Sequence, residues 1–549
     1  MVTKVAAAVL AALGLAGASP AHQALAKHSA KRTPHTRAAR TQALPVLFVV
    51  GHGWGHGVGL AQYGAYGYAL HGWSSDEIVA HYFPGTDLGD ARLHRVRVLL
   101  SSHAPRVVIS SRAPFTLRDG AGKKHKLAAG SYAFGPGLKV KLRAAKPARA
   151  LKGPLLFSPG AAPLALGGRG YRGALRVKAA APGLQVVNIV GLEPYLWGVV
   201  PSEMPNRWPA EALAAQALVA RTYALAHVQK GDFDLYSDTR SQVYGGIAAE
   251  SPSTTDAVNG TAGQVVLYNG ELADTFFFSS SGGRTANVQD VWSSPPVPYL
   301  VSVPDPYDTP SPYHNWGPLR YGGAVLARRL HVPGRIVDFG ANVAASGRVR
   351  TLTLVGTKGD RTVTGWRVRD ALGLRSTWFR LGLLSLSTPS ATVVYGSSLR
   401  LSGVARGVPR VSLEAQPYGG AWKTVGRLRV RNGAVSPTAS PRVTTDYRLE
   451  SGGFRSGSIR VSVAPLVQLA AGADGTWVSG LARPVLPGAA VQVQRLDGDV
   501  WDTVATTTID ANGNYSAQLQ LSPGSYRARV IAGHGFAVGV SDTVTVVAP

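Results

Sequence analysis

The chain has 549 residues, with 57 Lys and Arg against 30 Asp and Glu, so its formal net charge is +27. It contains no cysteine, which excludes a disulfide framework, a thiolate nucleophile and a cysteine-ligated metal. The length suits about three or four domains. A hydrophobic fraction of 45% with only 16% charged residues is typical of a folded chain.

The N-terminus predicts export. Residues 1–26 place Lys4 before an apolar run and end in an A-x-A cleavage site, the pattern of a secretory signal peptide. The run is shorter than the roughly 20 residues that span a bilayer, so we expect no transmembrane anchor after cleavage. Residues 27–44 are basic and poor in apolar side chains, and are expected to form a solvated linker. For an exported protein, the expected anionic partner is a cell surface or wall and not nucleic acid.

Residues 45–386 are predicted to form one α+β domain that is rich in strands. Short β-type runs separated by Gly and Pro fill residues 95–190. The clearest helix follows, because Pro209 suits its first position and residues 212–227 hold no Gly or Pro. A stripe of small side chains predicts that this is the main buried helix of the domain.

Beyond residue 386 the sequence repeats itself. Trp422 recurs as Trp501, and an Asn-Gly turn and a Tyr-Arg pair recur at nearly the same offset. Residues 387–466 and 467–549 are therefore predicted to be two tandem all-β, immunoglobulin-like sandwich modules that bind or space. The tryptophan of each copy is predicted to lie in the core of its module.

The first candidate for chemistry is the segment 51–65 (GHGWGHGVGLAQYGA), in which glycines alternate around His52 and His56. So many glycines predict unusual backbone conformations that another group approaches closely. The two histidines could ligate a metal, but the intervening glycines argue against a helix that presents both on one face. A tight structural turn is the alternative. No βαβ pattern surrounds the glycines, so a nucleotide site is not predicted.

The second candidate is Glu203, which lies between two prolines in an otherwise apolar stretch. We expect a rigid turn to hold its carboxyl beside aromatic surface. Desolvation there would raise the pKa of Glu203, as a general acid near neutral pH requires. The alternative is that Glu203 only caps the turn. Arg221, on the predicted helix, could orient that carboxylate or make a buried ion pair.

The third candidate is the run 276–285 (FFFSSSGGRT). Its hydroxyls could hydrogen-bond a sugar or hold a loop of an active site, or the run could simply end a strand in a turn. No GxSxG motif is present, so a serine nucleophile is not predicted.

Three segments together resemble the sporulation stage II protein D family (SpoIID/LytB), which includes the amidase enhancers. They are residues 195–223 (YLWGVVPSEMPNRWPAEALAAQALVARTY), 276–285 and 55–65. The resemblance covers roughly residues 45–385 and implies action on bacterial cell-wall peptidoglycan. In the best-understood branch this is lytic transglycosylation of glycan strands that lack stem peptides. Glu203 matches the catalytic glutamate, and no metal or other cofactor is implied. The candidate substrate-binding residues are Arg221, Tyr223, His56, Gln62, Tyr63, Ser280 and Ser281.

The order of the motifs departs from the family. The glycine-rich segment usually follows the other motifs, whereas here it precedes them, as in a circular permutation. Permutation requires the original termini to be close in space. We therefore expect residues 377–383 to lie beside Val46 to Val50 as neighbouring strands.

A lytic transglycosylase needs only one carboxylate. Glu203 would protonate the glycosidic oxygen and then accept the proton of the C6 hydroxyl of N-acetylmuramic acid, which closes a 1,6-anhydro ring. Glycoside hydrolysis requires a second carboxylate, so Glu193, Asp238 or Asp305 folded next to Glu203 would favour that reaction.

Two other functions stay open. One is a non-catalytic wall-binding protein that enhances a separate amidase, and the other is a binder of anionic polymers or nucleic acid that acts through its charge. The favoured hypothesis is a secreted cell-wall enzyme. Its expected partners are peptidoglycan glycan strands, anionic wall polymers and a separate amidase.

Overall fold

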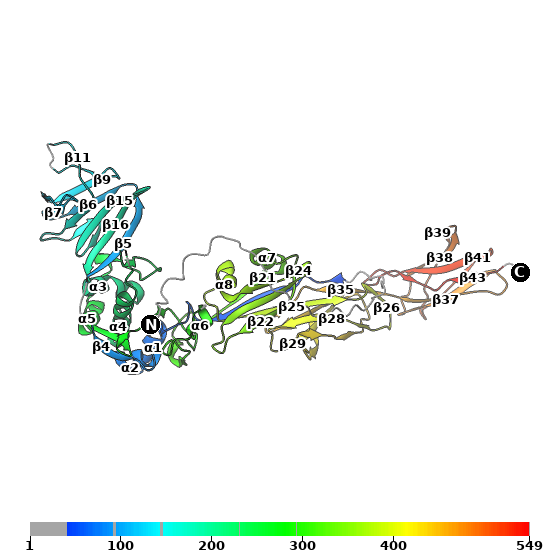
Figure 1. Cartoon of the computed structure of the whole chain (residues 1–549). Coiled ribbons are helices and arrows are strands. Elements are labelled where there is room, and N and C mark those ends of the chain that lie inside the picture. The colour runs from blue at the N-terminus through cyan, green and yellow to red at the C-terminus, as the bar shows by residue number, and fades with distance from the viewer. Residues whose placement is uncertain (1–40, 92–94, 143–145, 230, 293, 548–549) are drawn as a thin grey trace, which may run out of the picture.

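The computed structural model describes residues 41–91, 95–142, 146–229, 231–292 and 294–547. The predicted signal peptide and residues 27–40 of the predicted linker lie outside the described residues. Within the described ranges, no helix is both long and apolar enough to cross a membrane. The molecule is elongated, with a β-rich unit at one end, a helical region beside it, and a line of β units that leads to the C-terminus (Figure 1).

The helical region surrounds the long helix that the sequence predicts. The α-helices of the described residues are α1 (Gln62–Leu70), α2 (Ser75–Tyr82), α3 (Leu192–Glu203), α4 (Ala210–Ala226), α5 (Pro252–Gly260), α6 (Val288–Val291), α7 (Gly323–Leu330) and α8 (Gly365–Leu372). Helix α4 is confirmed as a largely buried helix, because 11 of its 17 residues are buried. It begins one residue later than predicted, with Pro209 as its N-cap. Small strands flank the helices, namely β3 (Leu60–Ala61), β4 (Asp87–Asp90), β18 (Gln264–Tyr268), β19 (Glu271–Leu272) and β20 (Phe277–Phe278).

Residues 95–191 form, with β17, a unit of two main sheets and the short β10–β11 pair, which confirms the predicted β-rich segment. One sheet has the order β17-β5-β16-β15-β12-β7-β8 and the other β14-β13-β6-β9. Alternate residues such as Leu117, Phe157 and Leu175 point between the sheets into a common core. The strands are β5 (Arg95–Ala104), β6 (Val107–Ser111), β7 (Phe115–Arg118), β8 (Lys124–Leu127), β9 (Gly130–Phe134), β10 (Lys139–Val140), β11 (Arg149–Ala150), β12 (Leu155–Ser158), β13 (Leu164–Leu166), β14 (Arg169–Tyr171), β15 (Ala174–Ala180), β16 (Gly183–Gly191) and β17 (Leu235–Tyr236).

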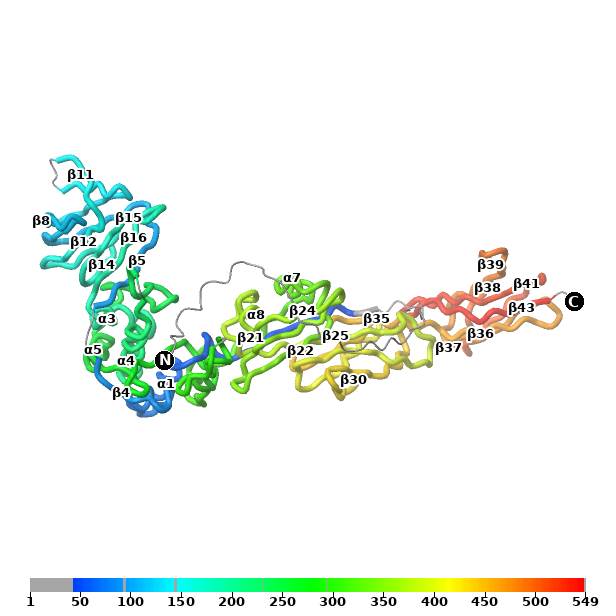
Figure 2. Tube along the Cα trace, viewed as in Figure 1, coloured from blue at the N-terminus to red at the C-terminus, as the bar shows by residue number. Residues whose placement is uncertain are grey.

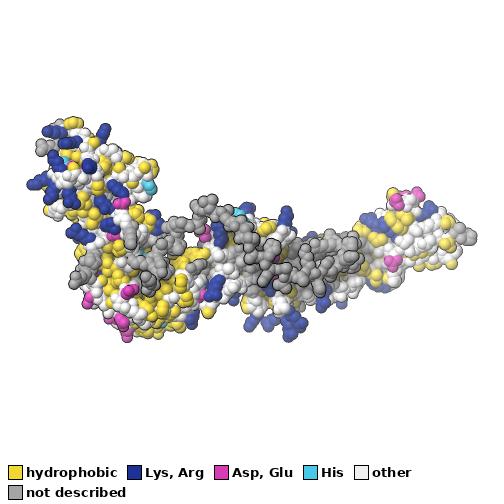
Figure 3. Space-filling model, in the orientation of Figure 1, with side chains coloured by type: hydrophobic (Ala, Val, Ile, Leu, Met, Phe, Trp, Pro, Cys, Tyr) yellow, Lys and Arg dark blue, Asp and Glu magenta, His cyan; other side chains and the backbone are white. Residues whose placement is uncertain are grey.

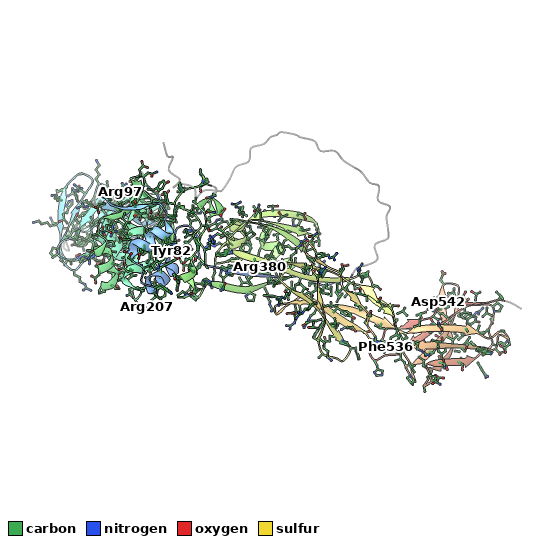
Figure 4. The ribbon with its side chains drawn as sticks, turned by 90° about the horizontal axis from the view of Figure 1, so that it is seen from below. Tyr82, Arg97, Arg207, Arg380, Phe536 and Asp542 are labelled. Atoms are coloured by element: carbon green, nitrogen blue, oxygen red, sulfur yellow. The ribbon has the colours of Figure 1, made fainter. Side chains whose placement is uncertain are left out.

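The central sheet carries the permuted segment. Strand β2 (Val46–His52) lies between β21 (Asn315–Gly322) and β25 (Phe379–Thr388), antiparallel to both. Val46 is opposite Leu384 and Val50 is opposite Arg380. This register confirms that the two segments are neighbouring strands, although pairing begins at Phe379 and not at residue 377. Figure 4 shows Arg380 on this sheet, Tyr82 among the helices and Asp542 in the last β unit.

The sheet also crosses the predicted domain boundaries. Strand β1 (Thr41–Gln42) pairs with β25, so the end of the predicted linker belongs to the sheet. The boundary expected at residues 386 and 387 falls inside β25, which also pairs with β28 of the next unit. A three-stranded sheet of β22 (Ile336–Val343), β23 (Val349–Gly356) and β24 (Gly359–Thr364) packs beside it with α7 and α8. One strand therefore serves two units, and the C-terminal modules are joined directly to the central sheet.

The two C-terminal units are built almost wholly of antiparallel strands. The first holds β26 (Thr392–Val394), β27 (Leu399–Arg400), β28 (Ser402–Arg406), β29 (Val411–Pro417), β30 (Lys423–Leu428), β31 (Ala434–Val435), β32 (Thr438–Ala439), β33 (Thr445–Ser451), β34 (Phe454–Arg455) and β35 (Ile459–Ala464). The second holds β36 (Leu466–Ala471), β37 (Trp477–Arg483), β38 (Ala490–Asp497), β39 (Val500–Thr508), β40 (Asn514–Gln518), β41 (Gly524–Ile531), β42 (Gly539–Val540) and β43 (Val544–Val546). Figure 2 shows them one after the other along the chain.

The repeated tryptophans do not lie in the module cores, so that prediction is wrong. Trp422 and Trp501 are only partly buried. Arg448 lies 3.8 Å over the ring of Trp422, and Arg527 lies 4.1 Å over the ring of Trp501. Each indole instead forms a cation–π pair at the module surface.

Candidate active site

Glu203 is the last residue of α3 and does not lie in a rigid turn as predicted. The helix ends there because Pro205 disfavours the helical conformation for the residue before it, and Met204 is extended at φ −126° and ψ 144°. The carboxyl therefore stands at a fixed helix end, where its Oε1 accepts a 2.9 Å hydrogen bond from the backbone N–H of Val243.

The carboxyl of Glu203 is largely shielded from solvent, as the sequence predicts. Burial raises the pKa of Glu203, and the hydrogen bonds from Val243 and the side chain of Gln62 only partly offset this effect. The charge of Glu203 in turn contributes to the raised pKa of both Tyr195 and Tyr223. Glu203 still keeps partial solvent exposure. These are the properties of a carboxyl that can hold a proton and remain within reach of a substrate.

The permuted segment supplies one wall of the site. Gln62 is the first residue of α1, and its side chain reaches Glu203. Next to it, the rings of Tyr63 and Tyr66 lie 5.0 Å and 4.7 Å from the ring of Trp208. All three aromatic side chains are partly exposed. They form an aromatic platform (Tyr63, Tyr66 and Trp208), and its first residue directly follows Gln62 in the chain.

A second polar cluster near Glu203 consists of Tyr223, His227 and Asp274. Burial, then the charges of Asp274 and Glu203, raise the pKa of Tyr223 to about 12, so its hydroxyl keeps its proton. Its ring stacks on His227 at 4.0 Å, and Nε2 of His227 lies 3.7 Å from Oδ1 of Asp274. Sequence reasoning missed Asp274 and His227, because neither lies in a recognisable motif.

Arg221 forms its ion pair with Glu193 and not with Glu203. Its side chain is completely buried, and Nε and Nη2 donate to both carboxylate oxygens of Glu193 at 2.8 and 2.7 Å. Further donors bind the backbone oxygens of Val258 and Gln264. The expected contact of Arg221 with substrate is therefore not supported, and the buried ion pair is what the structure contains.

None of the three carboxyl groups that the sequence offered as partners of Glu203 shows a contact with it. Glu193 is ten residues earlier on α3, which is about 15 Å along a helix. The Asp238 carboxylate is exposed and binds Arg240. Asp305 is fully buried, and desolvation and the charge of Asp308 raise its pKa to about 7. None of these three is among the groups that shift the pKa of Glu203.

The side chain of His56 is hydrogen-bonded to the backbone at both of its ring nitrogens. The N–H of Val58 donates to its Nδ1 at 3.1 Å, so its proton is on Nε2, which donates to the carbonyl of Phe277 at 3.0 Å. Burial lowers the pKa of His56 to about 3, and the ring is neutral. Both ring nitrogens are occupied, which leaves none for a metal or a sugar. The described residues hold no group of three or more His, Cys, Asp or Glu arranged to bind a metal ion.

Ser280 and Ser281 are also structural in this geometry. Both side chains are buried, and the hydroxyl of Ser280 donates to Asp308 at 2.8 Å. The backbone N–H of Ser281 donates to the same carboxylate at 2.9 Å. The predicted sugar contacts of these two serines are therefore not supported. Asp308 instead holds the serine loop beside the glycine-rich segment.

The glycines do have the unusual backbone that the sequence predicts. Gly53, Gly55, Gly57 and Gly59 all have positive φ, from 68° to 121°. A Cβ on Gly57 would lie 2.1 Å from Nη2 of Arg348, so the close neighbour is a protein side chain. The segment leads into β3, which pairs with β20 and so places α1 against the site.

Known proteins match the part of the chain that carries this geometry. The family profile described as "Stage II sporulation protein" (SpoIID) matches residues 180–268, which contain α3, Glu203 and α4. The chain carries a domain of the SpoIID family. The stage II sporulation protein D of Bacillus subtilis (strain 168) is 33% identical over 216 residues, which cover 36% of this chain and 61% of that protein.

Two other relatives share shorter segments with this chain. The amidase enhancer of Bacillus subtilis (strain 168) is 44% identical over 113 residues, 21% of this chain and 15% of that protein. An uncharacterized protein of Brachyspira hyodysenteriae is 38% identical over 142 residues, 25% of this chain and 38% of that protein. The chain thus spans between 15% and 61% of the length of these curated relatives. A two-domain fibronectin type III segment of chicken tenascin is 14% identical, over 27% of this chain and 90% of that one, with a TM-score of 0.19. This structural similarity is too low to assign a fold to the C-terminal modules.

Proposed function

We propose that this SpoIID chain is an exported cell-wall enzyme that cleaves peptidoglycan glycan strands, free of stem peptides, by lytic transglycosylation. One observation carries the proposal. Glu203 is desolvated enough to raise its pKa, remains partly exposed, and contacts Gln62, which directly precedes Tyr63 of the partly exposed aromatic platform. Aromatic rings next to a general acid suit a substrate with apolar sugar faces and a bond to protonate.

Glu203 acts first as an acid and then as a base. Its proton goes to the glycosidic oxygen as the bond from C1 to that oxygen breaks. The carboxylate then takes the proton of the C6 hydroxyl while the C6 oxygen bonds to C1, which gives a 1,6-anhydro-N-acetylmuramic acid end and restores protonated Glu203. Val243 N–H and Gln62 stabilise the carboxylate between the two steps. No water is consumed.

Hydrolysis is the competing reaction at the same site. It needs a second carboxylate at about 5–9.5 Å. Asp274 is the relevant group, because its charge and that of Glu203 both act on Tyr223. A second function, enhancement of a separate amidase without catalysis, is favoured by the relative that carries that name.

Mass spectrometry of products from peptide-free glycan strands tests the proposal. We compare the full chain with its Glu203→Gln and Asp274→Asn variants, and with Glu271→Gln as a control for loss of an exposed glutamate. Anhydro ends from every protein except Glu203→Gln are expected. Ordinary reducing ends that disappear in Asp274→Asn would show hydrolysis. No cleavage by any protein, with an amidase stimulated equally by wild type and Glu203→Gln, would establish the enhancer function instead.

A further inference from the structure

Positive charge is concentrated in the β-rich unit. Residues 95–182 hold 18 lysines and arginines and one acidic residue, Asp119, which is a net of +17 within the +27 of the whole chain. Figure 3 shows lysine and arginine side chains gathered over this end of the molecule, with few acidic side chains among them. A net charge of this density creates a strong local field for anions.

The register of the strands puts five of these cations on one sheet face. Arg118 is opposite Lys124, and Leu156 is opposite both Arg118 and Arg176. Since alternate residues share a face, Lys126 lies on the same side as Lys124, and Lys178 on the same side as Arg176. Neighbours on the other side, such as Leu117 and Leu175, fill the core. We call the outward side the basic face; its residues are Arg118, Lys124, Lys126, Arg176 and Lys178.

The basic face is neutralised at one end only. Lys178 binds the carboxylate of Asp232, and Arg176 binds the backbone oxygen of the same residue. At the far edge of the sheet, Arg118, Lys124 and Lys126 are exposed, and no acidic partner contacts them among the described residues. Like charges directly opposite each other on a sheet are destabilising. The Arg118–Lys124 pair is therefore an arrangement that a bound anion would relieve.

Nearby turns extend the patch. The carboxylate of Asp119 is occupied by His125 and by the backbone N–H groups of its own turn, including that of Lys123. The N–H of Gly120 donates to the carbonyl of Lys152 at 2.6 Å, which brings that exposed lysine next to the same turn. Cations thus follow the β7–β8 edge in a row, about 5 Å apart across strands and 7 Å apart along them.

We propose that the basic face binds a linear polyol-phosphate polymer of the cell wall. A row of cations spaced over adjacent strands suits a chain with one phosphate per short repeat. Base recognition would require exposed aromatic rings between the cations, whereas the phenylalanines of this unit, Phe115, Phe134 and Phe157, are buried in its core. The choice of a wall polymer rests on the proposed cell-wall function, but the polyanion site itself does not.

The test is a salt titration of binding to poly(glycerol phosphate), with single-stranded DNA of equal phosphate content as the second probe. The variant is the full chain with Arg118→Ser, Lys124→Ser and Lys126→Ser. The matched control removes three exposed cations elsewhere, by Arg328→Ser, Arg329→Ser and Lys358→Ser. Loss of three phosphate contacts is expected to flatten the slope of log K against log salt by about 2, at about 0.7 per contact. The control should keep the wild-type slope.

Several results would overturn the proposal. The first is an equal change in the slope of log K against log salt in the triple variant and its control, and the second is an unchanged slope in the triple variant. The others are no binding of poly(glycerol phosphate) by wild type, and tighter binding of DNA than of poly(glycerol phosphate). Lys124→Ser alone, with an expected change in slope of about 0.7, keeps the test valid if the triple variant folds poorly. Glu203→Gln should bind as wild type does. A failure of catalysis is thereby distinguished from a failure of this site.

Discussion

Replacing Arg221 separates a structural role for the buried ion pair from a role in substrate binding. In Arg221→Met, the Glu193 carboxylate, whose side chain is 10% exposed, would remain buried without its partner. Breaking a buried pair in this way costs about 3–5 kcal/mol, a large part of the roughly 5–15 kcal/mol that stabilises a typical domain. The carbonyls of Val258 and Gln264 would also lose their donor. We therefore expect strong destabilisation around α4.

Because the chain has several units, a single melting temperature does not measure this effect. Hydrogen exchange of α4 peptides in a urea series is the appropriate assay, with glycan cleavage per folded molecule measured in parallel. We expect faster exchange and a KM close to that of wild type. The double variant Arg221→Met/Glu193→Leu should recover part of the loss, because no unpaired charge remains. Wild-type exchange together with a raised KM would refute the structural role.

Three further perturbations test the site. Gly57→Ala should destabilise the glycine-rich segment by more than about 1–3 kcal/mol, since φ is +95° and Arg348 leaves no room for a Cβ. Gly72→Ala, with φ +83° and open space around it, bears the backbone strain alone. Hydrogen exchange of the peptides that contain each glycine, in a urea series, compares the two variants. The pKa of Asp305 is raised to about 7, so the folded state binds the proton of this carboxyl more tightly than the unfolded state does. The free energy of unfolding should therefore fall as the pH rises from 4 to 7 and then level off. Asp305→Asn should remove that fall in urea titrations. Trp208→Ala should raise KM for glycan strands about two- to tenfold, by loss of about 0.5–1.5 kcal/mol of ring stacking, in steady-state assays.

Local patterns predicted the elements and the desolvated carboxyl. Helix α4 follows from an uninterrupted run without Gly or Pro. The β2–β25 pairing follows instead from the order of motifs in the family that the sequence resembles. Pro201 suggested a turn around Glu203, yet this proline is accommodated in the last turn of α3. The sequence alone does not tell whether a proline near a helix end stops the helix or lies within its last turn.

The functions of single polar residues were harder to predict, because their partners are distant in sequence. Arg221 pairs with a residue 28 positions away, and His56 with one 221 positions away. Neither the hydrophobic periodicity nor a sequence motif indicates which distant residue a polar side chain will bind. The same reason explains why Asp274 was missed and why Ser280, which binds Asp308 in the interior, was taken for a candidate sugar ligand.

The central position of β2 fixes the order in which this protein can be assembled. The indole N–H of Trp316 donates a hydrogen bond to the carbonyl of Gly53, 263 residues earlier in the sequence. The hydroxyl of Ser376 donates to the carbonyl of His52, 324 residues earlier. At a synthesis rate of about 5–20 residues per second, the first strand waits at least roughly 13–50 s for its neighbours. Contacts this remote also form slowly. Gln62 lies ten residues beyond that strand and directly follows β3, which pairs with β20 at Phe277 and Phe278. A nascent chain that already contains Glu203 therefore still lacks the strand that anchors this wall of the candidate site.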